Sequence, residues 1–192
     1  NLGTRNGAIN CSATNGADGV NGRFFHACEF DGTDDYINFG DIGFFTEFSF
    51  EMWVKARNYT QQNMILGQDE SGQRSFFLTT QDTNSKLHFA AFNTAQTRFI
   101  DFMQDTATMV EGQWYHVAVV YEGNGGNAIV YIDGSVVKSG SITDDIHDST
   151  ADYWLGKDEF AANRHWNGII DEVAIYNRSL TADEVMAHYL RG

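Results

Sequence analysis

Phe48-Ser49-Phe50-Glu51-Met52-Trp53-Val54-Lys55 is the stretch of this chain with the clearest alternation. Its first, third, fifth and seventh residues are all large and apolar. Because successive side chains of a strand point to opposite faces, these four residues share one face. Glu51, Trp53 and Lys55 then lie on the outer face. The stretch predicts a β-strand whose inner face packs against a second layer.

Similar patterns, rich in β-branched and aromatic residues, recur along the whole chain. Further strands are expected at Phe24–Phe30, Tyr36–Phe39, Met64–Leu66, Ser75–Thr80, Lys86–Phe92, Thr97–Phe102, Trp114–Tyr121, Ala128–Ile132, Ser135–Ser139, Trp154–Lys157 and Asn167–Asn177. Asp133-Gly134 is a two-residue hairpin signal between two of these strands.

One helix is predicted at the end of the chain. Thr181 is its N-cap, Glu184 closes a capping box, and Leu180 with Val185 forms a hydrophobic staple. No crossover helices separate the strands, so parallel βαβ units are excluded. The expected fold class is all-β: a two-sheet antiparallel sandwich with one short C-terminal helix.

Length and composition are consistent with that fold. A chain of 192 residues fits one domain spanning residues 1–192 and can bury about 70% of its unfolded surface. The 15 Phe, 8 Tyr and 4 Trp residues can fill the gap between two sheets. Proline is absent, so the turns depend on Gly, Asn and Asp, and 19 glycines are present.

The net charge is −14 and the pI is near 4.5. Such a surface repels nucleic acid and anionic membranes, so neither is expected as a partner. No apolar run is long enough to span a membrane. The first residues do not form a signal peptide, so we expect a mature chain or a domain cut from a larger protein.

Cys11 and Cys28 are the two cysteines. A pair with none left over favours a disulfide in an exported protein, worth roughly 3 kcal/mol for a loop of this size. The alternative is two buried free thiols in a cytosolic protein.

Two acidic turns lie near the ends of the chain, in Phe30-Asp31-Gly32-Thr33-Asp34-Asp35-Tyr36-Ile37 and in Gly168-Ile169-Ile170-Asp171-Glu172-Val173. Placing acidic side chains among strand-forming residues costs free energy unless a positive charge compensates them. Oxygen-only ligands suit a hard cation, calcium above all. A polar β-turn, which Asp and Gly favour for backbone reasons, is the alternative.

Several blocks of the sequence occur together in one order. They are the two acidic turns, Phe48–Lys55, Gln113-Trp114-Tyr115-His116-Val117-Ala118, Val130-Tyr131-Ile132-Asp133-Gly134 and Val173-Ala174-Ile175-Tyr176-Asn177-Arg178-Ser179-Leu180. With these blocks the chain resembles the laminin-G-like, concanavalin-A-like jelly-roll domains of extracellular proteins. The resemblance implies two stacked antiparallel sheets, one of them concave, and a structural calcium ion at the sandwich edge. It implies Asp31 and Asp171 as side-chain ligands, Asp34 or Asp35 as a third, and backbone carbonyls near Gly32, Thr33 and Glu172.

The candidate ligand-binding residues are aromatic and polar side chains. An exposed aromatic side chain can stack on a sugar ring while nearby donors bind its hydroxyls. The candidates are Tyr59, Trp154, Arg164, His165 and Trp166, together with His147 in the acidic loop 144–152. That loop could also hold a second cation, or be simply solvated. The histidines show no pair at zinc-ligand spacing.

No catalytic motif is present. Glycosidase chemistry needs two facing carboxylates, whereas Asp171 and Glu172 are adjacent and so point to opposite faces of a strand. We therefore expect a non-catalytic, calcium-stabilised recognition module of a secreted or cell-surface protein, with carbohydrate, above all polysaccharide, as its ligand. The alternative is a module that binds extracellular protein, mediates adhesion or spaces other domains. A glycan-active hydrolase or lyase is the third hypothesis.

Overall fold

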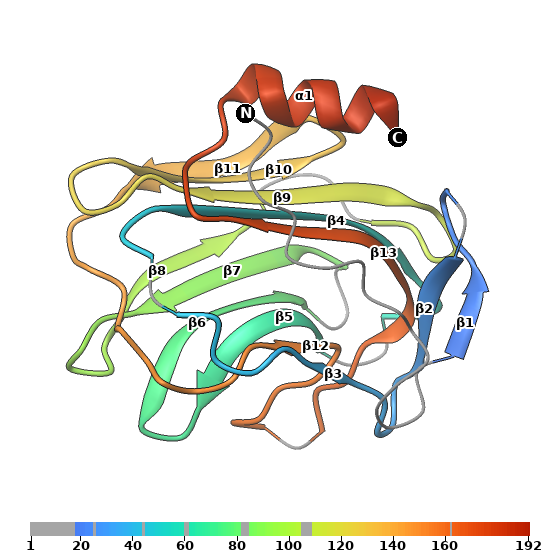
Figure 1. Ribbon diagram of the computed structural model, residues 1–192, viewed down its shortest axis with the longest axis horizontal. Helices are drawn as coiled ribbons and strands as arrows, with labels where there is room; N and C mark the ends of the chain where they lie inside the picture. The colour runs from blue at the N-terminus through green and yellow to red at the C-terminus, as the bar shows by residue number, and fades with distance from the viewer. Residues whose placement is uncertain are drawn as a thin grey trace.

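The computed structural model describes residues 18–24, 26–43, 45–59, 62–81, 85–104, 109–161 and 163–192. Within these residues the chain forms two antiparallel sheets and one C-terminal helix, α1 (Ala182–Arg191). Figure 1 shows three layers, because α1 lies on the outer side of one sheet. The predicted all-β sandwich with one short C-terminal helix is confirmed.

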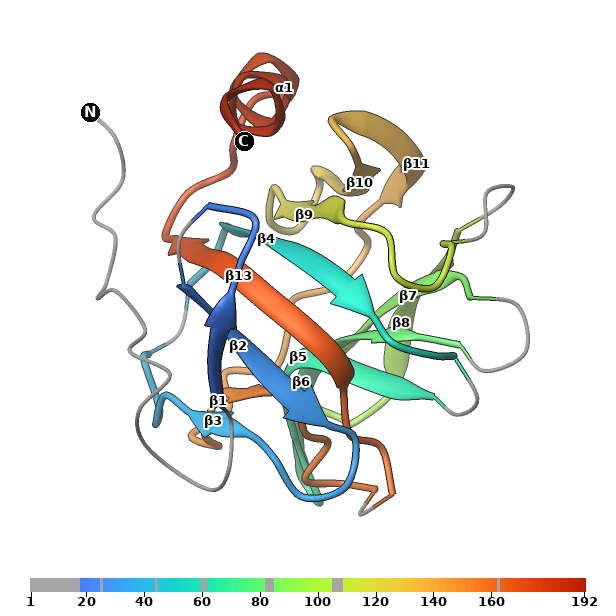
Figure 2. The ribbon, with the colours of Figure 1, turned by 90° about the vertical axis from the view of Figure 1, so that its right-hand side faces the viewer.

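The first sheet has seven of the described strands, in the order β1, β2, β13, β4, β9, β10, β11. Their bounds are β1 Asp18–Asn21, β2 His26–Asp31, β4 Phe48–Ala56, β9 Tyr115–Tyr121, β10 Asn127–Ile132, β11 Ser135–Ser141 and β13 Asn167–Tyr176. Figure 2 shows β13 between β2 and β4, so the last strand ties the early strands together. The β10–β11 hairpin turns at Asp133 and Gly134, which both have positive φ.

The second sheet has six of the described strands, in the order β3, β12, β5, β6, β7, β8. Their bounds are β3 Ile37–Asn38, β5 Asn63–Glu70, β6 Gln73–Thr80, β7 Leu87–Phe92, β8 Arg98–Met103 and β12 Trp154–Leu155. One face of this sheet packs against the first sheet. The other face is turned away from the core and carries the candidate site described below.

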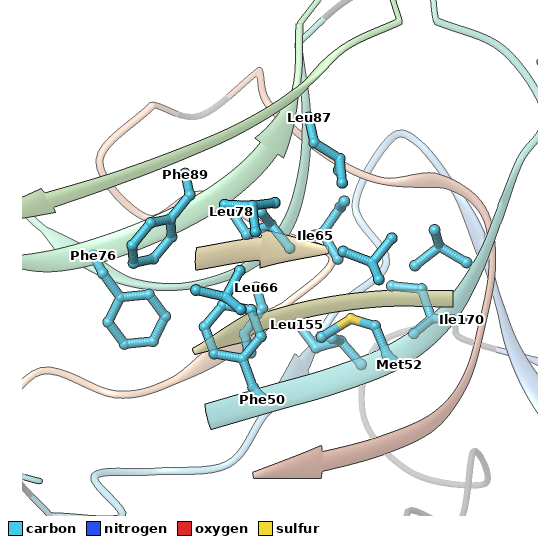
Figure 3. Close-up of a cluster of buried hydrophobic side chains, with 14 of the residues drawn as sticks. Phe50, Met52, Ile65, Leu66, Phe76, Leu78, Leu87, Phe89, Leu155 and Ile170 are labelled. Carbon is cyan, nitrogen blue, oxygen red and sulfur yellow. The ribbon is translucent and has the colours of Figure 1, made fainter. Parts of the chain in front are cut away.

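Aromatic rings from both sheets stack in the gap between them. Phe48 and Phe50 of β4 lie 5.4 and 5.6 Å from Phe76 of β6, measured between ring centroids. Phe89 of β7 lies 6.3 Å from Phe50, and Tyr121 of β9 lies 5.2 Å from Phe48. Figure 3 shows Phe50, Phe76 and Phe89 among aliphatic side chains of both sheets. Burying each large apolar side chain contributes roughly 1.5–3 kcal/mol.

The alternation predicted for residues 48–55 is confirmed in β4. The four inner-face residues all belong to the main core. Glu51 and Trp53 on the outer face are buried as well, because α1 covers them. The Trp53 ring lies 5.9 Å from that of Tyr189 on α1, and the Arg23 guanidinium lies 4.7 Å from the Trp53 ring. Both faces of this central strand are therefore packed.

Two strands differ most from the sequence prediction, while others, such as β3 and β12, are only shorter than predicted. The sequence does not predict β1, whose residues show no apolar alternation. β5 continues to Glu70 rather than ending at Leu66, pairing with β6 along its length. The register shifts between Met64 and Leu66, and both Ile65 and Leu66 enter the core. Such a bulge breaks the period of two from which strand length is deduced.

Helix α1 begins with the predicted capping box. The Thr181 side chain accepts a hydrogen bond from the Glu184 amide, and the Glu184 carboxylate accepts one from the Thr181 amide. Hydrogen bonds from Arg178, and then from Thr181, lower the pKa of Glu184 to about 2. Leu180 and Val185 share one apolar cluster, as the predicted staple requires. No helix in the described part of the chain is long and apolar enough to cross a membrane.

The carboxylate of Glu51 is buried between β4 and α1. It accepts a hydrogen bond from Tyr176 Oη at 2.6 Å and lies 2.9 Å from Nδ1 of His188 on α1. Nε2 of His116 lies 3.5 Å away. Burial raises the pKa of Glu51, but its hydrogen bonds to His116, Tyr176 and His188 outweigh burial, so the pKa lies below the ordinary value. The ionised carboxylate therefore helps to hold α1 on the sheet.

The predicted disulfide is only half within the described residues. Cys28 lies on β2, has a buried side chain and is in register with Ile170 of β13. Cys11 lies outside the described residues, so the Cys11–Cys28 bond stays a prediction.

Replacing Glu51 should remove one source of acid sensitivity. A carboxylate with a depressed pKa contributes stability above its ordinary pKa of 4.5, and this is lost as pH falls through the folded-state pKa. We expect Glu51→Gln to cost about 1–3 kcal/mol at pH 7 and progressively less below pH ~4.5. Urea denaturation at several pH values measures this, with Glu70→Gln as the control. A Glu51→Gln deficit that stays constant down to pH ~3 would contradict the role of its charge.

Candidate functional site

The outer face of the six-stranded sheet carries an apolar cluster that is separate from the main core. Its members are Met64, Phe77, Ala90 and Phe92, from β5, β6 and β7. We call these four residues the aromatic floor. On β6 and β7 they alternate with residues of the main core, so they point away from the first sheet. Their near-complete burial means that other groups cover this face.

The floor continues across the sheet to Trp154 of β12. Trp154 is in register with Gly67, Gly67 with Phe77, and Phe77 with Ala90. A Cβ atom on Gly67 would lie 2.1 Å from the end of the Met64 side chain. Met64 therefore occupies the space that a side chain at position 67 would take. The result is a continuous apolar surface from Trp154 to Ala90.

Arg74 joins the aromatic floor to residues 157–161 and 163–165, which we call the cover segment. Its guanidinium lies 3.8 Å from the ring centroid of Phe92 and 4.2 Å from that of Phe160 in the cover segment. Nε and Nη2 of Arg74 donate to the two oxygens of Asp69 at 2.5 and 3.1 Å. Phe160 is 48% exposed. The stack thus presents one aromatic ring to solvent beside a buried aromatic surface.

A second ion pair shapes the cover segment itself. Arg164 Nη1 donates to Asp158 Oδ2 at 3.1 Å, while Asp158 Oδ1 accepts from the amide of Phe160 at 2.9 Å. Burial raises the pKa of the neighbouring Asp69 and outweighs its hydrogen bonds from Arg74, and the charge of Asp158 adds to the rise. Two buried carboxylates and two guanidinium groups therefore meet on this face.

His88 lies on the same face, at the β7–β8 side. Gln81 Nε2 lies 2.7 Å from His88 Nδ1, and Asp101 Oδ1 lies 2.5 Å from Nε2. An amide nitrogen can only donate, so Nδ1 accepts and Nε2–H donates to Asp101. Burial lowers the pKa of His88 more than Asp101 raises it, and Arg98 and Arg164 lower it further. The imidazole is therefore neutral at pH 7.

Lys157 covers the Trp154 end of the surface. Its Nζ lies 4.7 Å from the ring centroids of both Trp154 and Tyr36, and 2.5 Å from Glu159 Oε2. Tyr36 packs edge-on against Trp154 at 5.1 Å. Lys157 also forms an isolated β-bridge with His165. The two ends of the face are thus each closed by a cation that lies over aromatic rings.

The acidic loop after β2 brings three predicted metal ligands together. One oxygen from each of Asp31, Asp34 and Asp35 lies within 4.8 Å of the others. Asp31 Oδ1 accepts from the Thr33 amide at 2.7 Å, and Asp35 Oδ2 accepts from the Asp31 amide at 2.8 Å. Gly32 has a φ of 82°, which favours glycine and lets the chain turn. Both Asp34 and Asp35 therefore belong to the cluster.

The spacing of these carboxylates fits a calcium ion. Two oxygens bound to one calcium, each at about 2.3–2.6 Å, lie at most about 5 Å apart. An ionised carboxylate has about four acceptor positions, so the amide hydrogen bonds leave capacity for a cation. The charges of the loop also act on His165: burial lowers the pKa of that imidazole, Lys157 lowers it further, and Asp34, Asp31 and Asp158 oppose the change.

The structure does not bring Asp171 to this cluster. Asp171 is in register with Trp53, four positions along β13 from Asn167, the residue that pairs with Asp31. Its Oδ2 accepts from the Arg23 amide at 2.8 Å, and its Oδ1 accepts from the amide of the next residue at 2.8 Å. A Cβ atom on Gly22 would lie 2.3 Å from Oδ2. Asp171 therefore holds the turn between β1 and β2.

The predicted ligand-binding residues divide into two groups. Trp166 is 0% exposed and Tyr59 is nearly as buried, and both belong to the main core, so neither offers a ring for stacking. Arg164, His165 and Trp154 lie in or beneath the cover segment. His147 accompanies them, since its Nδ1 lies 2.9 Å from Gln96 Nε2 and 3.3 Å from the carbonyl oxygen of Arg74.

Sequence reasoning missed Arg74, Asp69, Asp158 and Phe160. One signal was available for the first pair: Asp69 and Arg74 flank the Gly72 turn between two strands, where opposite charges face each other. No local signal identifies Phe160, because its partner Arg74 is distant in the sequence.

The sequence over residues 31–186 matches the family model of the concanavalin A-like lectin/glucanases superfamily. The chain belongs to this superfamily. The resemblance inferred from the sequence blocks is thereby confirmed. A comparison with curated protein sequences finds no match.

Solved structures share the fold at low sequence identity. Domain 4 of an extracellular arabinanase from Geobacillus stearothermophilus, in complex with arabinotriose, has a TM-score of 0.71 and 21% identity, covering 96% of this chain and 84% of that one. The binding domain of Paraclostridial Mosquitocidal Protein 1 has a TM-score of 0.71 and 18% identity, covering 91% and 45%. A heptameric SAP-like pentraxin from Limulus polyphemus has a TM-score of 0.66 and 17% identity, covering 82% and 78%.

Asp171 should stabilise the protein without a metal. Removing a charged acceptor of backbone hydrogen bonds in Asp171→Ala should cost about 1.5–3 kcal/mol. The loss should be equal in calcium and in chelator, because the bonding partners are amides. Chemical denaturation in both buffers measures it, with Asp171→Asn as the milder variant. A loss of stability seen only in calcium would indicate that Asp171 is a metal ligand.

Proposed function

We propose that this domain is a non-catalytic carbohydrate-binding module that takes its ligand at the cover segment, which Arg74 joins to the aromatic floor. The observation that carries the proposal is the Arg74 stack. It fixes a half-exposed ring, Phe160, beside further aromatic rings and paired polar groups. An aromatic ring next to oriented donors and acceptors is what a sugar needs, since its C–H face stacks and its hydroxyls form hydrogen bonds.

Two further facts support this proposal. The similar arabinanase domain binds arabinotriose, which shows that this architecture can hold a saccharide. The polar groups at the face are held in place by their own partners, as in the Asp69–Arg74 and Asp158–Arg164 pairs. Groups that are already immobilised lose less side-chain entropy when a ligand binds.

The same pairs favour binding over catalysis. A glycosidase needs one carboxyl group that can donate a proton and a second that acts as base or nucleophile. On this face Asp69 and Asp158 are each held by a guanidinium group, and Asp101 lies between His88 and Arg98. Such carboxylates are engaged in structural contacts rather than directed at a common point.

We also propose that the cluster of Asp31, Asp34 and Asp35 binds a structural calcium ion. The cluster concentrates negative charge at the end of β2 in a protein that is already acidic. A cation there would offset the mutual repulsion of the three carboxylates and fix the loop. Asp35 is the most buried of the three, so its charge gains most from a cation.

An exported protein is the setting we propose for this module. The net charge of −14 and the pair of cysteines fit an extracellular environment. The arabinanase that contains the similar domain is itself extracellular. In that setting the module would act beside other domains of a longer chain.

Phe160 should be required for glycan binding. Loss of one stacking ring, worth about 0.5–1.5 kcal/mol, should weaken the affinity of Phe160→Ala by up to about tenfold. Phe160→Trp should keep or improve it. A glycan array followed by calorimetry on each ligand found measures both variants. Val136→Ala on β11, which removes an exposed apolar side chain (54%) from the other sheet, is the control. Equal affinity of Phe160→Ala and the unaltered protein would show that the glycan site does not lie on this face.

Chelation should lower the melting temperature by several degrees, because a ligand present at 100 times its Kd adds about 2.7 kcal/mol. Asp35→Asn should melt at one temperature with or without chelator. Asp41→Asn, which changes an exposed aspartate outside the cluster, should keep the calcium effect. Thermal unfolding in calcium and in chelator provides the measurement. An unaltered protein that melts identically in both would exclude a structural calcium ion.

A further inference from the structure

We infer that the glycan bound at the cover segment is neutral rather than acidic, an inference that rests on the proposed function. It follows from how charge is arranged on this face. The protein is strongly acidic, yet Arg74, Arg98, Lys157 and Arg164 lie on or beside this face. A basic group at a ligand site would ordinarily suggest an anionic ligand.

Each of these four cations already has a carboxylate partner on the same face. The pairs are Arg74–Asp69 at 2.5 Å, Arg164–Asp158 at 3.1 Å, Lys157–Glu159 at 2.5 Å and Arg98–Asp101 at 3.4 Å. The pairs balance, so these residues give the face no net positive charge. Each of these cations is therefore already paired with a carboxylate of the protein.

Two of the carboxylates prevent exchange of partners. The side chains of Asp69 and Asp158 are 0% and 1% exposed. If Arg74 or Arg164 turned to an external anion, it would leave a buried carboxylate without its counter-ion, which is strongly unfavourable. The rings of Phe92 and Phe160, which the Arg74 guanidinium contacts, hold it in addition. An acidic sugar could therefore contact these guanidinium groups only beside their buried carboxylates and could not replace those carboxylates as counter-ions.

The wider field also disfavours an anion. The net charge is −14, and one calcium ion bound at the cluster of Asp31, Asp34 and Asp35 would still leave it at −12. A polyanionic glycan approaching the protein would therefore meet repulsion. An uncharged polysaccharide would not.

Hydroxyl groups match what the face does offer. A guanidinium group has five N–H donors, and Arg164 Nη1 uses one of them on Asp158 Oδ2. Asp101 and Glu159, at the edge of the face, have partly exposed carboxylates that can accept. A hydroxyl both donates and accepts, so adjacent hydroxyls of a neutral sugar can bridge a donor and an acceptor of the same ion pair.

The test compares neutral and acidic polysaccharides in one calcium-containing buffer. The probes are arabinan, galactan and mixed-linkage β-glucan on one side, and polygalacturonate and alginate on the other. Affinity is measured at about 0.1 M and about 1 M salt, across which the screening length falls from about 10 Å to about 3 Å. We expect binding to at least one neutral probe, unchanged by salt and weakened in Phe160→Ala.

A variant that removes the counter-ion of one arginine tests the same argument directly. Asp158→Asn keeps the Oδ1 atom that accepts from the amide of Phe160 but removes the counter-ion of Arg164. We expect it to gain salt-sensitive binding to polygalacturonate. Asp183→Asn on α1 makes the same change in net charge on the other side of the protein and should gain none. Thermal unfolding first establishes that both variants fold.

The outcomes separate the inference from the function on which it rests. Binding of the unaltered protein to an acidic probe, weakened by salt and by Phe160→Ala, would overturn neutral selectivity while leaving a glycan site on this face. Neutral binding that Phe160→Ala leaves intact would place the site elsewhere and remove the argument from charge. Absence of binding to every probe would overturn both the inference and the proposed function.

Discussion

The structure depends on the aromatic stack between the two sheets. Phe48 and Phe50 from the first sheet meet Phe76 and Phe89 from the second, and these rings fill the gap that separates the sheets. Because side chains alternate along a strand, fixing which residues point inward also fixes which residues point outward. The rings therefore determine which residues lie on the two outer faces. The candidate site is one consequence: Phe77 points outward because its neighbours Phe76 and Leu78 point inward.

Both outer faces are then covered, and each cover is held by a buried carboxylate. On the seven-stranded sheet Glu51 holds α1 through His188. On the six-stranded sheet Asp69 holds Arg74, whose guanidinium contacts Phe160 of the cover segment. A guanidinium group stays charged at every pH that a folded protein meets. The contact that positions the candidate site thus keeps its cation at every pH at which the protein is folded.

The fold could be predicted from the sequence because its signals are local. The alternation around Phe50 and the capping box at Thr181 each lie within a few residues, and both are confirmed. The candidate site could be predicted only in part. Asp31 and its neighbouring aspartates lie in one turn and do meet. Asp171 has the residue type of a calcium ligand, but register on β13 places it against the turn at Arg23, and register is not visible in a single sequence. Phe160 was missed because its partner Arg74 is distant in the sequence.

Aromatic residues were also poor guides when taken one at a time. Trp166 carries a larger ring than Phe160, yet Trp166 is completely buried, since a large ring gains most from the core. What distinguishes Phe160 is a cation that holds it at the surface. Arg74 contacts two rings and forms a bidentate ion pair with Asp69. Its side chain therefore loses its conformational entropy when the protein folds, before any ligand binds. A ligand that stacks on Phe160 therefore meets a ring that is already positioned, and binding depends on the fold of the cover segment as much as on the ring.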